Sequence, residues 1–494
     1  MFLACFSNRS RLHSGLKLFV LAQLVLAAGC SESTSEKIDE LPEIPFEGQQ
    51  IQIAIPAGLG LANAWQIDLD EWTAQTRATW NLVDYDPSDQ QKPLAEGLGF
   101  GSGAQGQGAT LFVFPITRVA ELVEQDLLAE IPVESLRWGD LFPGLREGPG
   151  SIAGRPGVVP ISSPVLLCYY RHDLFESEQL SPPETWDDYQ KLLQKLGERG
   201  LRAVEPWNEQ FRATMFLSRA VAYAKHPNQF SLFFDIRSGE PLIDGPGFVR
   251  ALEESRAAID QMNSRGNVTG YSPLECRRDF FTGKAAMAIC YETGNAEPAA
   301  ERPASMTVGF VRLPGQPDAY NRSTRQWEPP PNGEINRCTL TAFSGLGVGV
   351  SKRATAPQQQ AAWHLLSQIA VEPERLIRLF PAATRSLCRT TQLARPEAWT
   401  GDDLTSGESR QYVDVLAASL RDSRLVAELS VLGRAKFRRS LSTGIGKVLS
   451  GTADPQQALR AVAQEWREIA AEIGETKVLN SYRRSLGLSP LLED

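Results

Sequence analysis

Short apolar runs alternate along the chain with segments of helical periodicity. A strand is predicted at Gln50 to Pro56, where polar and apolar residues alternate, and three more are predicted over 80–85, 109–114 and 345–351. Helices are predicted over 68–76, 187–200, 247–262 and 356–371. Strands that alternate with helices favour a parallel sheet, and the pattern therefore predicts an α/β fold.

The helix with the most complete pattern is predicted after Asp454. This residue occupies the N-cap position, Pro455 the first helical position, and Gly474 follows the end. Apolar residues at helical spacing, including Leu459 and Trp466, form one face. Start, apolar face and end agree, so the helix is predicted over about 455–473.

The N-terminal 29 residues have the organisation of a secretory leader. A basic stretch precedes an apolar run from Leu18 to Leu26, and small residues precede Cys30. Ten or so apolar residues are too few to span a bilayer, so we expect cleavage. The small residues before Cys30 resemble a bacterial lipobox, which implies lipidation of that thiol; an ordinary cleaved signal is the alternative. Residues 31–45 are polar and acidic and predict a flexible tether.

Charge and cysteine content exclude several kinds of function. Without the three basic residues of the leader, 47 basic residues stand against 59 acidic ones, a net charge of −12. Nucleic acid is therefore not an expected partner. Beyond Cys5 and Cys30, five cysteines remain, in no recognisable disulfide framework. Zinc-site spacings are absent from the sequence, so we expect neither a metal nor a cofactor.

One glycine motif suggests nucleotide binding but has the wrong context. Gly101 to Gly106 fits G-x-G-x-x-G. That fingerprint must follow a strand and open a helix, whereas this run precedes the strand predicted at 109–114. A glycine-rich loop is the better interpretation.

Five short blocks occur in the order found in family 1 extracellular solute-binding proteins, and the chain resembles that family. The blocks are 114–118 with 122–132, 170–175 (YRHDLF) with 182–189 (PPETWDDY), 281–289 (FTGKAAMAI), 345–352 and 451–469. Each block alone is short, but their common order makes the resemblance specific. It covers most of residues 48–475.

The resemblance implies a two-lobed periplasmic-binding-protein (type II) fold, related to the maltose-binding protein, with a hinge and a ligand cleft between the lobes. Lobe one would comprise 48–160 and 304–344, and lobe two 161–303 and 345–480. They follow a signal peptide (1–29) and a tether (30–47), and a tail (481–494) ends the chain. The roughly 450 residues after the tether independently favour two lobes.

Three candidate ligand residues lie in matching blocks. Arg118 falls where the maltose-binding protein places an arginine that donates to sugar hydroxyls, and an arginine fork suits polar ligand groups. Glu205 and Trp207 match a Glu-Pro-Tyr block whose acid accepts a hydroxyl hydrogen bond and whose ring stacks on a sugar. The alternatives are a surface arginine and a tryptophan of the core.

Five further candidates follow from position. Trp65 comes after the first strand, and packing on the adjacent helix is its alternative. Ser162 and Ser163 lie at the expected first crossing between the lobes, where a plain turn is the alternative. Tyr291 and Glu292 follow the strand at the end of the 281–289 block. Sites of this fold class lie on such loops.

The resemblance implies a non-catalytic solute-binding subunit that takes a carbohydrate to the permease subunits of an ABC importer. We expect a monomer outside the cytoplasm, anchored to a membrane through the lipid on Cys30. An envelope carbohydrate-active enzyme with paired carboxylates is one alternative, and a sensory lipoprotein of the same fold is another. The family's acidic residue is missing from the loop 55–60, so the solute stays open.

Overall fold

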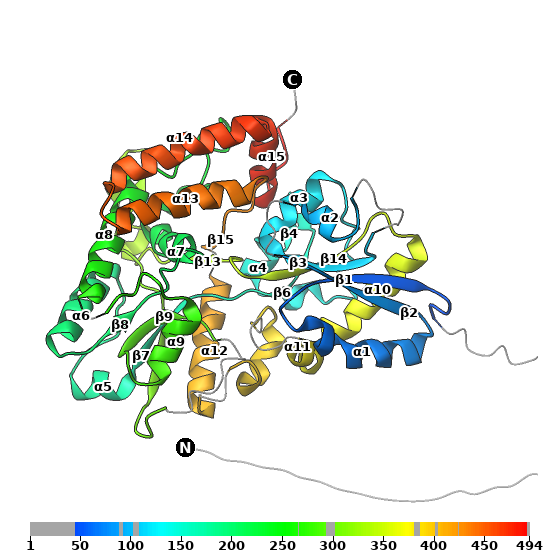
Figure 1. Ribbon diagram of the computed structural model, residues 1–494, viewed down its shortest axis with the longest axis horizontal. Helices are drawn as coiled ribbons and strands as arrows, with labels where there is room; N and C mark the ends of the chain where they lie inside the picture. The colour runs from blue at the N-terminus through cyan, green and yellow to red at the C-terminus, as the bar shows by residue number, and fades with distance from the viewer. Residues whose placement is uncertain are drawn as a thin grey trace, which may run out of the picture. The chain divides into compact units, whose positions relative to one another are not determined.

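The computed structural model describes residues 45–87, 92–101, 108–264, 266–292, 302–379, 386–400, 404–422 and 424–491. They belong to one compact unit, Ile44–Asp494. This unit contains two larger β-sheets with their helices (Figure 1). The leader, most of the tether and Cys30 lie outside the described residues, so cleavage and lipidation stay predictions.

The first sheet has five strands in the order β2-β1-β3-β14-β6. They are β1 (Gln50–Pro56), β2 (Thr79–Tyr85), β3 (Leu111–Pro115), β6 (Val159–Ser162) and β14 (Leu346–Val350). β1 pairs in parallel with β2 and β3, whereas β14 runs antiparallel to β3 and β6. The four strands predicted first are confirmed, and the sheet is mixed rather than wholly parallel.

Helices cover both faces of the first sheet, as its alternating side chains require. The three isoleucines of β1 lie in the same apolar core as α1 (Leu61–Thr76) and α10 (Ala356–Ile369). Ala54, between two of them, packs in a separate core with α2 (Leu94–Gly97) and α3 (Val119–Glu124). Successive side chains of a strand point to opposite faces, so β1 contributes to both cores.

Helix α1 begins seven residues before its predicted start. Gly60 precedes it with φ of 69°, in the left-handed region that glycine adopts without strain. Trp65 therefore lies within the helix instead of on a loop, and its side chain is buried in the core with 1% exposure. Leu61, Trp65, Leu69 and Trp72 share the buried face, a helical spacing that the sequence already contained.

The strand pairing differs from the predicted division into lobes. β10 (Val308–Arg312), predicted in lobe one, pairs with β7 (Leu167–Arg171) of the second sheet, whereas β14, predicted in lobe two, lies inside the first sheet. The glycines of β14 give the physical reason. A Cβ on Gly347 would lie 2.4 Å from Val158 Cγ1. Glycine thus suits this strand to a crowded central position.

The second sheet has four strands in the order β10-β7-β9-β8. β9 (Met287–Cys290) pairs in parallel with β8 (Ala203–Val204) and antiparallel with β7, which is antiparallel to β10 as well. At its centre the ring of Tyr169 meets that of Phe310 edge to face, with 4.8 Å between centroids. Such contacts add to the stabilisation from apolar burial.

Amphipathic helices pack around the second sheet and on one another. They are α6 (Trp186–Glu198), α7 (Arg212–Ala224), α8 (Pro246–Asn263), α9 (Pro273–Phe281), α13 (Arg434–Leu449) and α14 (Pro455–Ile473). The predicted start of α14 is confirmed, because Asp454 accepts hydrogen bonds from the backbone N–H groups of Gln456 and Gln457 at 3.0 and 3.2 Å. The helices predicted over 187–200, 247–262 and 356–371 are confirmed within two residues at either end.

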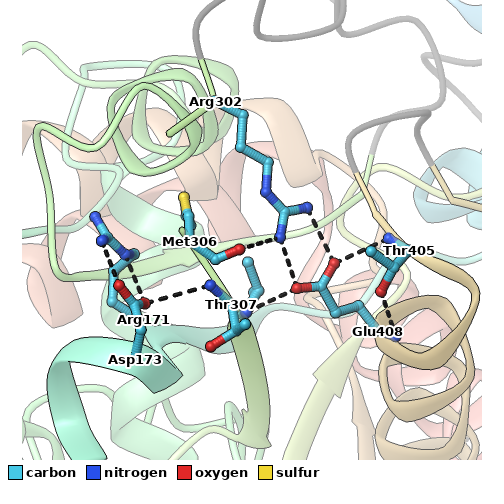
Figure 2. Close-up of polar contacts among 8 residues, drawn as sticks. Arg171, Asp173, Arg302, Met306, Thr307, Thr405 and Glu408 are labelled. Atoms are coloured by element: carbon cyan, nitrogen blue, oxygen red, sulfur yellow. Dashed lines mark hydrogen bonds and ion pairs between the residues drawn. The ribbon is translucent and has the colours of Figure 1, made fainter. Parts of the chain in front are cut away.

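Helix α12 (Ser406–Arg421) is attached to the second sheet by a polar clamp (Figure 2). The Glu408 carboxylate accepts from both terminal nitrogens of Arg302, at 2.6 and 3.0 Å, and from the backbone N–H of Val308 at 2.8 Å. Thr405 caps the helix and shares a capping box with Glu408. The start of α12 is thereby fixed against β10.

The remaining elements are short. They are α4 (Pro143–Glu147), β4 (Ser151–Ile152), β5 (Arg155–Pro156), α5 (His172–Ser177), β11 (Ala319–Asn321), β12 (Gln326–Glu328), β13 (Thr339–Thr341), α11 (Pro373–Leu379), β15 (Leu425–Ala427) and α15 (Glu475–Ser485), with single 3-10 turns at Ile116–Arg118, Trp138–Asp140, Pro331–Gly333, Thr390–Ala394 and Pro396–Ala398. The proline-containing segment 320–337 includes strands of the hairpin β11–β12. It also includes the fully buried Asn336, whose side chain donates to the Ala222 carbonyl at 2.7 Å.

Candidate functional site

Two segments connect the two sheets, and the segment that joins α12 to α13 runs beside them. The first leaves β6 at Ser162 and enters β7, the second includes β13, and the third includes β15. β13 and β15 pair in parallel, and the Ser163 and Thr341 hydroxyls are 2.6 Å apart. Ser163 and Thr341 are buried, so this hydrogen bond joins the first two segments inside the protein. We call the three segments the crossing segments.

Strands of both sheets end beside the crossing segments. In the first sheet, Leu346 pairs with Pro115 at the end of β3 and with Ser162 at the end of β6. In the second, Leu167 pairs with Cys290 at the end of β9. Ligands of open α/β sheets bind at the carboxyl ends of strands. We therefore take the residues that follow β3, β8 and β9 as the candidate site.

An aromatic group lies at these strand ends. Tyr291 follows β9, Phe211 precedes α7, and Phe343 follows β13. Ring centroids are 6.1 Å apart for Tyr291 and Phe343, 5.7 Å for Phe211 and Phe343, and 6.4 Å for Phe211 and Tyr291. Tyr291 is half-buried, and the two phenylalanines are each less than a tenth exposed. The group spans the second sheet and a crossing segment.

The hydroxyl of Tyr291 stays protonated at neutral pH. Burial raises its pKa to about 12, although a hydrogen bond with Ser344 acts in the opposite direction. A neutral phenol both donates and accepts hydrogen bonds. Tyr291 thus offers an apolar ring and a polar hydroxyl, which suits a ligand with both kinds of surface.

Glu205 and Trp207 precede Phe211 in the chain, and both lie in the protein interior. The Glu205 carboxylate accepts from Trp207 Nε1 at 2.8 Å and from Arg219 Nη2 at 2.9 Å. Glu205, Trp207 and Arg219 are at most 1% exposed, and the guanidinium of Arg219 stacks on Trp186 at 4.1 Å. The predicted stacking ring therefore has no solvent-facing surface here. Its contacts fix the path of the chain from β8 to α7.

Glu292 is also bonded within the second sheet. Its carboxylate accepts from the Tyr169 hydroxyl at 3.0 Å and from Arg277 at 3.0 and 3.2 Å. Its backbone N–H donates to the Tyr412 hydroxyl at 3.1 Å, which brings α12 into the same network. Glu292 thus orients the backbone next to Tyr291.

Arg118 follows β3, as predicted, but its donors are used locally. Its Nε and Nη2 donate to Glu121 at 2.7 and 2.8 Å, and Nη2 also donates to the Lys92 carbonyl at 2.8 Å. Glutamate three residues after arginine at a helix start is a spacing that favours such a pair. The sequence spacing therefore already indicated that Arg118 pairs locally with Glu121.

A buried acid that the sequence prediction missed lies on the third crossing segment. Glu428 accepts from Arg434 at 2.8 Å and from Arg438 at 3.1 Å, and its backbone N–H donates to Thr341. Although burial opposes ionisation, the two arginines hold the pKa of Glu428 below its usual value. This ion pair ties α13 to the crossing segments.

The structure brings some of the eight predicted residues together and separates others. Ser163 and Tyr291 lie at the crossing segments and the adjoining strand ends, with Glu292 next in the chain. Ser162 ends β6 and is buried in the first sheet. Trp65 is a core residue of α1. Phe211 and Phe343 were missed, because they are 132 residues apart and neither belongs to a recognisable motif.

A separate groove of about 920 Å³ lies beside the third crossing segment. Its walls come from α4, from 225–233 and from 421–428. None of the eight predicted residues lines it. It is lined by β15 and not by the residues that follow β3, β8 and β9, so we do not assign the solute to it.

The described residues contain neither a metal-binding cluster nor a membrane-spanning helix. These residues include no group of three or more His, Cys, Asp and Glu side chains that could hold a metal ion. No helix within the described ranges is long and apolar enough to cross a membrane. The glycine motif lies, beyond Gly101, outside the described residues.

The fold defined by these two sheets and their crossing segments occurs in known binding proteins. Maltose-bound MalE3 of T. maritima has 18% identity and a TM-score of 0.61, over 85% of this chain and 99% of the other. A solute-binding protein of an ABC transporter from Agrobacterium radiobacter, in complex with ribitol, has 16% and 0.62, over 86% and 100%. The sugar-binding protein MalE of Xanthomonas citri has 17% and 0.63, over 86% and 98%. The predicted two-lobed periplasmic-binding-protein fold is confirmed.

The sequence itself identifies the family. The family model of bacterial extracellular solute-binding proteins matches residues 75–403. The chain belongs to this family, whose members act outside the cytoplasm.

Proposed function

We propose that this protein is the substrate-binding subunit of an ABC importer for a carbohydrate or polyol, and that it performs no catalysis. The observation that carries the proposal is the group of Phe211, Tyr291 and Phe343 at the strand ends beside the crossing segments. Aromatic faces with a neutral phenol suit the apolar and hydroxylated surfaces of a sugar. The maltose and ribitol bound by proteins of the same fold support this class of solute.

The crossing segments provide the conformational response. A solute that contacts residues of both sheets binds the closed arrangement more tightly, and this difference in affinity shifts the protein toward closure. The closed arrangement is then what the permease subunits recognise. Ser163, Thr341 and Glu428 hold the three crossing segments together, so they transmit the bend without separating.

Residue roles in this proposal follow from exposure and existing bonds. Tyr291 contacts the solute, since it is the least buried member of the aromatic group. Glu205 and Trp207 position the chain between β8 and α7, because both are enclosed and bonded to each other. Arg118 orders the start of α3 through Glu121 and reaches solute only through its remaining donors.

Calorimetric titration of the mature protein with maltose, maltotriose, ribitol and mannitol tests the proposal. Tyr291→Ala should weaken binding about tenfold or more, equivalent to ~1.4 kcal/mol, while Tyr291→Phe should retain most of the affinity. Tyr320→Ala, on β11, is the matched control and should bind as the wild type does. No heat and no thermal shift with any member of a broad sugar and polyol panel would refute the assignment, and hydrolysis of a sugar would favour the enzyme alternative.

The importer and the anchor need separate tests. In proteoliposomes that contain the permease and its ATPase subunits, the solute-loaded protein should stimulate ATP hydrolysis, and the solute alone should not. Cys30→Ser should move the protein from the membrane fraction to the soluble fraction. Retention of Cys30→Ser in the membrane fraction would exclude the lipid as the anchor without affecting the proposed solute class.

A further inference from the structure

An arginine cluster lies on the side of the second sheet, where β10 ends and two crossing segments begin. Arg312 ends β10, Arg337 leads into β13, and Asp422 with Arg424 leads into β15. None of these residues belongs to the aromatic group or its supporting contacts. The cluster therefore needs an explanation other than solute binding.

Asp422 is the only carboxylate that bonds directly to these arginines among the described residues. Its Oδ2 accepts from Arg312 Nη2 at 2.7 Å, and its Oδ1 accepts from the backbone and side chain of Arg424 at 2.9 and 3.3 Å. The Asp422 side chain is 9% exposed. Although burial opposes ionisation, the bond from Arg312 holds the pKa of Asp422 below its usual value. One charge thus neutralises one of the guanidinium groups.

Two guanidinium groups keep unused donors. Arg337 Nη2 donates to the Glu184 backbone carbonyl at 2.9 Å, and the described residues place no carboxylate within ion-pair distance of Arg337. Nε of Arg337 and Nε of Arg312 are both buried, and neither has a hydrogen-bond partner among the described residues. Burial, with Arg312 nearby, lowers the pKa of Arg337. These two guanidinium groups therefore have hydrogen-bonding capacity that the described residues leave unused.

Both arginines line the same groove, of about 610 Å³, between α12 and the segment 182–184. The other charged side chains that line it are Glu184, Arg410 and Asp414, all of them exposed at its rim. The rim contributes a net charge of −1, whereas the half-buried Arg312 and Arg337, against the Asp422 that pairs with Arg312, keep a net charge of +1. Buried charges are screened less than exposed ones, so the positive part dominates inside.

We propose that this groove binds a small oxyanion of the phosphate or sulfate type between the guanidinium groups of Arg312 and Arg337. The planar forks of arginine match the oxygen geometry of such anions, and the anion balances the charge of Arg337, which has no carboxylate partner among the described residues. The groove has room for a free anion or for one carried on a small organic group. The bound anion joins the end of β10 to the start of the second crossing segment.

Titration with inorganic phosphate tests the proposal, with potassium chloride added to keep the ionic strength constant. Calorimetry on the mature wild-type protein should show saturable binding, and Arg337→Gln should weaken it at least tenfold. Arg337→Lys keeps the charge but loses the fork, so it should give an intermediate affinity. A parallel titration with glycerol phosphate distinguishes free phosphate from a phosphomonoester as the better ligand.

A matched control and a stability measurement keep the test decisive. Arg467→Gln removes an arginine of α14 that pairs with Glu240 and is 43% exposed, and it should leave phosphate binding unchanged. Without phosphate, Arg337→Gln should be at least as stable as the wild type, because it loses a half-buried charge that has no carboxylate partner among the described residues. Equal phosphate stabilisation of both proteins would indicate general salt exclusion and overturn the proposal. So would an Arg337→Gln protein that fails to fold in its absence.

Discussion

The substitution Glu205→Gln tests whether Glu205 contacts the ligand or only positions the chain. The carboxylate is fully buried and accepts from Arg219 and Trp207, at 2.9 and 2.8 Å. A glutamine has one acceptor oxygen, and its NH₂ group would face one of the two donors. Arg219, itself 1% exposed, would then keep its charge without a carboxylate.

Breaking a buried ion pair on one side costs about 3–5 kcal/mol. At roughly 2 °C per kcal/mol for a protein of this size, Tm should fall by about 6–10 °C. Glu178→Gln is the matched control, because Glu178 pairs with Arg199 at 2.7 Å but the two side chains are 41% and 34% exposed. That change should cost less than about 1 kcal/mol.

Differential scanning calorimetry and solute titration together provide the assay. The folded Glu205→Gln protein should bind solute within a few-fold of the wild type, since the carboxylate is enclosed. Adding Arg219→Met should restore much of the lost stability, because replacing both charges removes the uncompensated one. A Glu205→Gln protein with wild-type Tm and no solute binding would refute this reasoning and return Glu205 to direct contact with the ligand.

Three further predictions concern acid, packing and thiols. The pKa values of Glu408, Asp422 and Glu428 are depressed in the folded protein. Their contribution to stability is therefore complete above the unfolded pKa of about 4 and is lost as pH falls through the folded values. Glu428→Gln should flatten the fall of Tm measured from pH 5 to 3, and an unchanged slope would contradict the assignment. Gly349→Ala should cost about 1–3 kcal/mol in chemical denaturation, since its Cβ would lie 2.7 Å from Leu128 Cδ2, whereas Gly407→Ala, with nothing within 4 Å, should cost nothing. Five cysteines are buried and have raised pKa values, about 11 for Cys338 and about 12 for Cys388; the other three are Cys168, Cys276 and Cys290. Ellman's reagent should therefore modify these thiols only after unfolding. Rapid reaction of the native protein would contradict their burial.

Local patterns in the sequence predicted most elements but not their partners. The alternation in β1 and the capped apolar face of α14 are contained within a few residues, and the structure has both. Sheet membership depends on long-range pairing, and the predicted lobe bounds therefore separated β10 and β14 from the strands with which they pair. The crowding around Gly347 and Gly349 agrees with the central place of β14, and it involves residues far away in the chain.

The same limit explains the candidate site. The sequence showed that Glu205 and Trp207 have the chemistry to hold a sugar, but their hydrogen-bonding capacity is used by each other and by Arg219. Conversely, Tyr291 was predicted by its place after a strand, whereas Phe211 and Phe343 become its neighbours only through the fold. Residue type restricts the chemistry, and burial decides which residue remains available for a ligand.

The second crossing segment connects the two proposed sites. Arg337 lies at one end of β13, in the oxyanion groove, while Thr341 and Phe343 lie at the other, beside Ser163 and Tyr291. A bend that moves one end of so short a strand also moves the other. If both ligands act on this bend, phosphate must change solute affinity by the same factor by which solute changes phosphate affinity. Calorimetric titration of each ligand in the presence of the other should give the same factor in both directions. In the Arg337→Gln protein this factor should be 1.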